Sequence, residues 1–350
     1  MPHLPPDRPA RETRGGPVFF EETTYYFPGA KPAIVGKLSY LCLLKTALYL
    51  TDMTSHTHII ADVVEQLSYR DPQSKLSYHG SDEQRMPSIE KLDEIIGLCR
   101  KLLFPGYFGL SGLNGLTIGY HLGTAAERLY ILLADQVFSV LHFDNSETCD
   151  ASSLAELHRT AEEHAARFIE ALPELRRLLS TDVIATYNGD PAAESYGEVI
   201  YCYPAIRAMI NYRVAHQMHQ QGIPLIPRIL TEMAHSETGI DIHPAATIGE
   251  YFSIDHGTGV VIGATAIIGK NVKLYQGVTL GAKSFPLDDE GNPIKGIPRH
   301  PILEDDVIIY SNATILGRIT IGRGATIGGN IWVTEDVAPN ARIVQSKARK

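Results

Sequence analysis

Two short groups of polar residues interrupt an aliphatic stretch in the last third of the chain. The first is Asp255-His256, with Asp241 a little earlier, and the second is Arg299-His300. A carboxylate beside an imidazole can orient one ring nitrogen and leave the other free as a general base. A guanidinium can hold a carboxylate through two parallel hydrogen bonds. Each residue also has a plainer explanation, because a His in a turn and an Arg at a solvated loop end are both common.

The elements that must position these residues have a period of six. Such a period fits neither an amphipathic helix nor an alternating strand. It predicts a triangular β-helix of stacked hexapeptide coils, in which each aliphatic side chain points into a continuous core and Gly lets the backbone turn. The aliphatic positions are Ile242, Ile248, Ile254, Ile262, Ile268, Leu274, Leu280, Leu303, Ile309, Ile315, Ile321, Ile327 and Val333.

Both polar groups fall where this period breaks. The step from Ile254 to Ile262 is eight residues, so two extra residues must bulge outward around His256. One coil of three hexapeptides has about 18 residues, which places Asp241 and His256 near one edge on neighbouring coils, roughly 4.8 Å apart. The second break is a 23-residue step that ends just after Arg299-His300. A loop of this length in a compact repeat is usually functional or disordered.

Composition limits the class of protein. The chain has 350 residues, which is enough for two domains, and its 44% hydrophobic and 20% charged residues are typical of a globular protein. A net charge of −9 argues against nucleic-acid binding through a basic surface. The four cysteines lack C-x-x-C spacing, so no metal site is predicted, and they fit reduced thiols in a cytoplasm, although an even count also permits disulfides. Neither a signal peptide nor a membrane span is predicted.

The chain divides into a mobile arm, a helical domain, a β-helix and a tail. The predicted boundaries are 1–30 for the arm, 31–235 for the α-helical domain, 236–344 for the β-helix with a loop at 281–302, and 345–350 for a short basic tail. Within the helical domain the apolar spacing predicts helices at about 37–66, 87–104, 123–142, 152–179 and 199–221. Pro173 is expected to kink or divide the fourth of them.

Several motifs resemble those of bacterial and plant serine O-acetyltransferases, members of the left-handed β-helix hexapeptide acyltransferase superfamily. The hexapeptide period alone indicates only the superfamily, whereas the DIHPAA, IDHGTG and RHP stretches in this order are specific. The resemblance covers residues 188–344, under half of the chain. The matching stretches are Gly189-Asp190-Pro191-Ala192, Tyr212–His216, Asp241–Gly249, Ile254–Gly263, Gln276–Gly281 and Arg299-His300-Pro301.

The resemblance implies a left-handed coil, acetyl-CoA as the donor, L-serine as the acceptor and direct transfer in the first step of cysteine biosynthesis. It makes His256 the general base and Asp241 its orienting carboxylate. Serine would be held by Asp190, Asp255, Arg299 and His300, and acetyl-CoA by Gly281, Ala282, Ser311 and Gly328. The sequence departs from the family pattern at the donor site, because Ala282 stands where a second Gly is common and Tyr310-Ser311-Asn312 replaces Gly-Ala-Gly.

The resemblance also implies a homo-oligomer, a trimer or a dimer of trimers, with L-cysteine as a feedback inhibitor. Family members often dock a C-terminal Ile into O-acetylserine sulfhydrylase, but this chain ends in Lys350, so no tail-mediated complex is expected. Two alternatives remain open. One is a hexapeptide acyltransferase acting on another amino acid or a sugar hydroxyl, and the other is a β-helix that serves only as a scaffold.

Overall fold

The computed structural model describes residues 56–69, 86–109, 115, 117–144 and 150–345. The chain forms two compact units, Met1–Tyr78 and His79–Lys350. The first contains α2 (His56–Ser68), which falls within and just beyond the helix predicted at 37–66. The predicted arm and most of the predicted tail lie outside the described residues. Everything below concerns the second unit.

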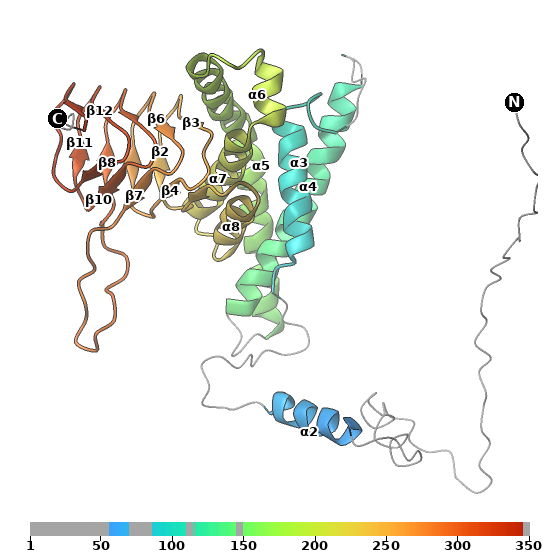
Figure 1. Cartoon of the computed structure of the whole chain (residues 1–350). Coiled ribbons are helices and arrows are strands. Elements are labelled where there is room, and N and C mark those ends of the chain that lie inside the picture. The colour runs from blue at the N-terminus through green and yellow to red at the C-terminus, as the bar shows by residue number, and fades with distance from the viewer. Residues whose placement is uncertain (1–55, 70–85, 110–114, 116, 145–149, 346–350) are drawn as a thin grey trace, which may run out of the picture. The chain divides into compact units, whose positions relative to one another are not determined.

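Among the described residues of this unit, six helices precede the β-helix (Figure 1). At α3 the Ser88 hydroxyl accepts a hydrogen bond from the Lys91 N–H, as an N-cap should. The helices are α3 (Ile89–Leu103), α4 (Ile118–Asp144), α5 (Ala151–Gly189), α6 (Tyr196–Cys202), α7 (Pro204–Gln220) and α8 (Ile226–Thr238). Within the described parts of the chain, no helix is both long and apolar enough to cross a membrane.

Three helix predictions need correction. Helix α5 is not divided at Pro173 and continues to Gly189, ten residues beyond the predicted end. The helix predicted at 199–221 is two helices separated at Tyr203, because the residue before Pro204 is disfavoured in helical conformation. Helix α8 was not predicted, since Gly222 and Pro224 read as the end of the helical pattern.

The C-terminal part is a parallel β-helix, which confirms the predicted fold class of helices followed by a left-handed parallel β-helix. Its strands form three sheets, ordered β1-β4-β7-β10-β13, β2-β5-β8-β11 and β3-β6-β9-β12-β14, here called the first, second and third sheets. All thirteen periodic aliphatic side chains are buried. The strands are β1 (Asp241–Ile242), β2 (Thr247–Ile248), β3 (Ser253–Asp255), β4 (Val261–Ile262), β5 (Ile267–Ile268), β6 (Lys273–Tyr275), β7 (Thr279–Gly281), β8 (Ile302–Leu303), β9 (Ile308–Ile309), β10 (Thr314–Leu316), β11 (Thr320–Ile321), β12 (Thr326–Ile327), β13 (Trp332–Val333) and β14 (Arg342–Ile343).

A buried ion pair joins the helices to the first coil. Arg213 on α7 pairs with Asp182 on α5 at 3.0 and 3.1 Å, and both side chains are almost fully buried. The same guanidinium donates to the carbonyls of Ile248 and Gly249 at 2.6 Å. Asp182 also accepts from the Phe252 N–H at 3.2 Å. This network fixes α5 and α7 against the first coil of the β-helix.

Two corners of the β-helix carry the candidate site residues. We call the edge where third-sheet strands lead into first-sheet strands the His256 corner, since residues 256–260 connect β3 to β4. We call the edge where first-sheet strands lead into second-sheet strands the Arg299 corner, since residues 282–301 connect β7 to β8. That loop leaves the β-helix as an extended hairpin (Figure 1), with Leu287 bridging Pro293.

Candidate active site

The first break in the period is an outward bulge at the His256 corner. His256 has φ +58° and is followed by Gly257 at φ +93° and Gly259 at φ +80°. Other corner residues of the β-helix, among them Tyr251, Asn271 and Asn312, have the same positive φ, so this conformation marks a corner turn rather than a functional site. The His256 side chain is 76% exposed, with Nε2 3.6 Å from Oδ1 of Asp255. The bulge therefore presents an imidazole to solvent beside a carboxylate.

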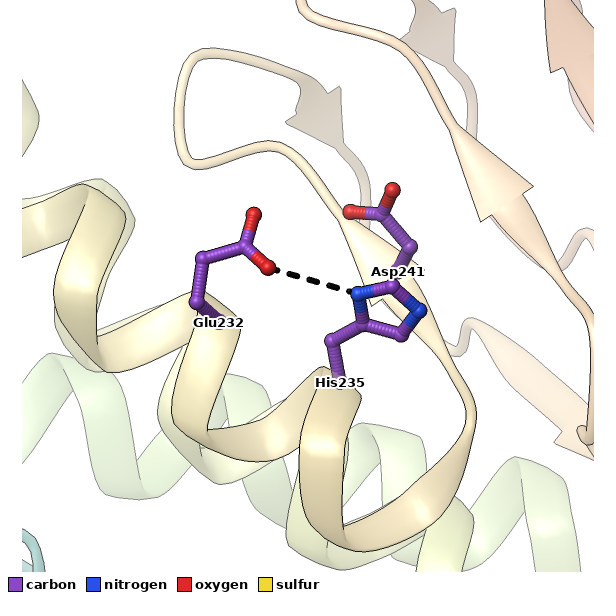
Figure 2. A group of neighbouring side chains, drawn as sticks. All are labelled: Glu232, His235 and Asp241. Atoms are coloured by element: carbon purple, nitrogen blue, oxygen red, sulfur yellow. Dashed lines mark hydrogen bonds and ion pairs between the residues drawn. The ribbon is translucent and has the colours of Figure 1, made fainter.

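Asp241 lies against the same bulge on the neighbouring coil. Its N–H donates to the Val260 carbonyl at 2.9 Å. Asp241 pairs in register with Val261, 20 residues later, whereas a coil of 18 residues would place it opposite Gly259. The two bulged residues account for the difference. The Asp241 carboxylate groups with Glu232 and His235 of α8 (Figure 2). Its proposed action on His256 therefore stays a prediction.

Asp190 and Asp255 line one small pocket together with Tyr203 and Lys273. The Tyr203 hydroxyl donates to Oδ2 of Asp190 at 2.6 Å. This bond, and a second from the Ala192 N–H, lower the pKa of Asp190. The same bond to Asp190 raises the pKa of Tyr203 to about 12. The structure thus brings the two predicted ammonium-binding carboxylates together, although they come from the end of α5 and from β3.

Lys273 completes this group. Its Nζ lies 3.1 Å from Oδ2 of Asp255, donates to the Gly189 carbonyl at 2.6 Å and stands 4.5 Å from the Tyr275 ring centre. Burial lowers the pKa of Lys273, but the interactions with Tyr275 and Asp255 outweigh it, and the net pKa is raised. Lys273 is therefore a cation held against one of the two carboxylates.

The Arg299 corner holds a buried imidazole. The Nδ1 atom of His300 accepts from the Thr265 N–H at 3.1 Å, so the neutral ring carries its proton on Nε2. Burial, reinforced by the charges of Arg299 and Arg318, lowers the pKa of His300 to about 4. Gly263 makes room for the ring, because a Cβ at Gly263 would lie 2.0 Å from its Cδ2. His300 is thus a neutral donor at neutral pH.

Arg299 is anchored by its backbone and leaves its guanidinium available. Its N–H donates to the Thr265 hydroxyl at 2.9 Å, and its guanidinium lies 5.8 Å from the ring centre of Phe285. Its Nε is buried and has no hydrogen-bond partner among the described residues. The same corner holds His243, which lies between β1 and β2. Burial, followed by nearby positive charges that include Arg299, lowers the pKa of His243 to about 4. This corner can therefore receive an anion.

Comparison with known proteins gives the family. No family model matches the chain. The sequence is 49% identical over 265 residues to the protein named serine acetyltransferase, plasmid, of Synechococcus elongatus, an alignment covering 75% of this chain and 83% of that relative. The chain belongs to the serine acetyltransferase family. It is therefore an acyltransferase, and the resemblance predicted from its motifs is confirmed.

Other members of the serine acetyltransferase family agree. The Helicobacter pylori serine acetyltransferase is 42% identical over 171 residues, which is 49% of this chain and 95% of that protein. The crystal structure of Entamoeba histolytica serine acetyltransferase 1 in complex with L-cysteine superposes with a TM-score of 0.63 at 36% identity, covering 72% of this chain and 86% of that one. The fold and the sequence thus place the chain in the same family.

The residues predicted to bind the donor lie on both corners. Gly281 and Ala282 lie at the Arg299 corner, where β7 ends. Ser311 and Gly328 follow β9 and β12 at the His256 corner. The Gly328 N–H already donates to the Ile343 carbonyl at 2.7 Å. Nothing in a single chain brings the two pairs together, and their role in donor binding stays a prediction.

Sequence reasoning missed Tyr203 and Lys273. Lys273 lies opposite Ser253 in register, so moving one coil from the Asp255 strand would have found it. Tyr203 follows a helix that has no periodic relation to the β-helix. In the sequence, Tyr203 stands out only because it precedes Pro204. That position predicts a break in the helix but does not indicate a contact with Asp190.

Proposed function

We propose that this chain transfers the acetyl group of acetyl-CoA to the hydroxyl of L-serine, giving O-acetyl-L-serine and CoA on the route to cysteine. The relatives named serine acetyltransferase support this reaction. The observation that carries it is the opposite charge of the two corners. One presents two carboxylates beside an exposed imidazole, and the other presents a guanidinium with an unpartnered buried Nε.

A free amino acid matches this arrangement. Its ammonium fits Asp190 and Asp255, which the Tyr203 hydroxyl and the Lys273 ammonium hold in place. Its carboxylate fits the Arg299 guanidinium, which can form two parallel charge-assisted hydrogen bonds. A neutral sugar offers neither an ammonium to the two carboxylates nor a carboxylate to the guanidinium. The polar groups therefore favour an amino acid over a sugar hydroxyl.

The chemistry needs a base at the hydroxyl. His256 would take the serine hydroxyl proton on one ring nitrogen as the oxygen attacks the thioester carbonyl. The C–S bond then breaks, and the thiolate of CoA leaves and takes up a proton. Such base assistance is typically worth about 10²–10⁴ in rate. Asp241 would orient the ring, and no covalent enzyme intermediate is required.

The two corners lie on opposite edges of the first sheet, so that the width of one hexapeptide face, up to ~20 Å of extended backbone, separates them within one chain. Corners from two different copies can lie closer together. We infer that the His256 corner of one copy faces the Arg299 corner of another. A closed trimer, alone or as a dimer of trimers, would form one such site at each interface.

The same site would bind L-cysteine as an inhibitor. Cysteine carries the ammonium and carboxylate that the two corners are proposed to hold. Entamoeba histolytica serine acetyltransferase 1 has been crystallised with L-cysteine, which supports the proposal. Inhibition should be competitive with serine, and inhibition that excess serine does not relieve would contradict it.

The deciding experiment compares acceptors. Thiol release from acetyl-CoA is measured with serine, homoserine and a galactoside at equal concentrations. We expect serine to give the highest kcat/KM. A preference for the galactoside would assign a sugar acyltransferase, and no thiol release with any acceptor would favour a scaffold.

A binding experiment tests the tail. We expect O-acetylserine sulfhydrylase to bind the full chain and a chain lacking residues 345–350 equally. Tight binding that is lost on truncation would contradict this expectation.

A further inference from the structure

Three potential metal ligands converge where α8 meets β1 (Figure 2). Glu232, His235 and Asp241 each offer one ligand atom, and these atoms lie within 4.8 Å of one another. Glu232 and His235 are three residues apart on α8, so they share one face of the helix. Gly239, at φ +70°, ends α8, and the chain then turns so that Asp241 lies over its last turn. All three ligands therefore stand on regular elements rather than on a loop.

The spacing suits a metal better than a hydrogen bond. Nδ1 of His235 lies 3.4 Å from Oε2 of Glu232, which is long for a hydrogen bond between these atoms. Two ligands of a tetrahedral zinc ion, each ~2.1 Å from the metal, lie roughly 3.4 Å apart. Arg228 pairs with Oε1 of Glu232, so Oε2 is the oxygen that faces Nδ1 of His235.

The ligand types select the ion. Two carboxylates neutralise a divalent cation, and an imidazole favours zinc over magnesium. The His235 and Glu232 side chains are 45% and 44% exposed, so an ion can enter from solvent. Three protein ligands leave the fourth tetrahedral position to water. The cysteine spacing gave no sign of such a site, because none of its ligands is a thiol.

We propose that Glu232, His235 and Asp241 form a zinc-binding site whose occupancy lowers acetyl transfer. The second half rests on the proposed function, in which the Asp241 carboxylate orients His256. A zinc ion that ligates Asp241 removes that carboxylate from the imidazole. Zinc would then act as a reversible inhibitor that competes with the His256 imidazole for the Asp241 carboxylate. The groups that bind the two substrates would not be affected.

The site itself is tested by calorimetry with zinc sulfate on the untagged full chain. We expect one zinc per chain, and affinity at least about tenfold weaker in His235→Ala and in Glu232→Gln, since even outer-shell partners contribute 10–100-fold. His219→Ala, which removes another exposed helical imidazole on α7, is the matched control and should bind like the wild type. Equal affinity in the wild type and His235→Ala, or equal binding of magnesium, would overturn the site.

The regulatory half is tested by rate at fixed free zinc. Zinc should slow the wild type and His219→Ala, and leave His235→Ala at its own zinc-free rate. Zinc that binds the wild type without slowing it would overturn this half. If serine proved not to be the acceptor, the isotherms would still test the site, and the rate comparison would be made with the acceptor that is used.

Discussion

The two corners of the β-helix differ in charge, in burial and in origin. The His256 corner combines carboxylates from a helix end and a strand with an imidazole that is 76% exposed. The Arg299 corner combines a guanidinium with the His300 ring, which is 7% exposed and packed against Gly263. The first is completed by α5 and the segment around Tyr203, and the second by the long loop. A regular repeat thus acquires two different surfaces from the segments added at its edges.

This difference fits the tasks that we propose for the two corners. A base must exchange protons with substrate and solvent, so an exposed bulge suits His256. A group that reads a carboxylate gains from a water-poor setting, where its hydrogen bonds are stronger. Burial also keeps His300 neutral, so it can donate from Nε2 without adding a second charge beside Arg299. We therefore propose that the His256 corner carries the base together with the ammonium-binding carboxylates, and that the Arg299 corner recognises the carboxylate of the substrate.

The largest expected effect is at the base. His256→Ala should lower kcat by about 10²-fold or more, since base assistance is typically worth 10²–10⁴. Steady-state kinetics measure the loss, and the melting temperature should stay unchanged because the side chain is exposed. His219→Ala is the control and should keep the wild-type rate. A folded His256→Ala protein with near-normal kcat would remove His256 from the mechanism.

The pairing of corners from different copies predicts complementation. His256→Ala and Arg299→Ala should each be nearly inactive alone. Co-expressed at equal amounts, they should regain about a quarter of the wild-type rate, because a quarter of randomly assembled interfaces join two intact corners. Activity no higher than the mean of the two single variants would show that both corners serve one chain.

Arg299→Lys should separate recognition from chemistry. We expect the KM for serine to rise about tenfold with little change in kcat, since hydrogen bonds to charged groups contribute 1.5–3 kcal/mol and Lys lacks the planar fork. Arg323→Lys, an exposed arginine paired with Asp305, is the control. Equal use of serine and serine amide by the wild type would show that Arg299 does not read the carboxylate.

Much of the fold could be predicted from the sequence because the spacing of the buried aliphatic residues reflects the geometry of the coil. Ile242, Ile262 and Leu280 stack in register, and their spacing gives the coil length wherever no residues are inserted. The helices were harder to predict from the sequence. Leu225, at φ +53° between Pro224 and Ile226, lies at a break that read as the end of the helices, and α8 begins immediately after it.

The neighbours of a site residue could be predicted only where both residues belong to the hexapeptide repeat. Asp241 and the His256 bulge are adjacent because they lie one coil apart, as the period indicated. Tyr203 reaches Asp190 through a helix break, and no period links those segments. The family motifs indicated Asp190 and Arg299 as binding residues, but placing them on different corners required the order of the sheets.

The buried imidazoles of the Arg299 corner predict a dependence of stability on pH. Burial lowers the pKa of His300 from 6.5 to about 4, so the folded state binds fewer protons than the unfolded state between these values. The free energy of unfolding should therefore be highest above pH 6.5 and fall as the pH drops toward 4. Denaturant titrations at several pH values measure the slope. His300→Asn should flatten it, and an unchanged slope would contradict this origin.

The smallest effect is expected at Lys273, which fixes Asp255 but also carries the same charge as the incoming ammonium. The Gly189 carbonyl and the Tyr275 ring share its charge, so we expect orientation of Asp255 to outweigh repulsion. Lys273→Met should raise the KM for serine by about fivefold, since the orientation of one carboxylate is expected to contribute about as much as one ordinary hydrogen bond, ~1 kcal/mol. The value of kcat should not change, and Lys273→Arg should restore part of the affinity. Lys270→Met, at a surface pair with Glu250, is the matched control. A KM below that of the wild type would show that repulsion dominates, and that the His256 corner is tuned to weaken serine binding.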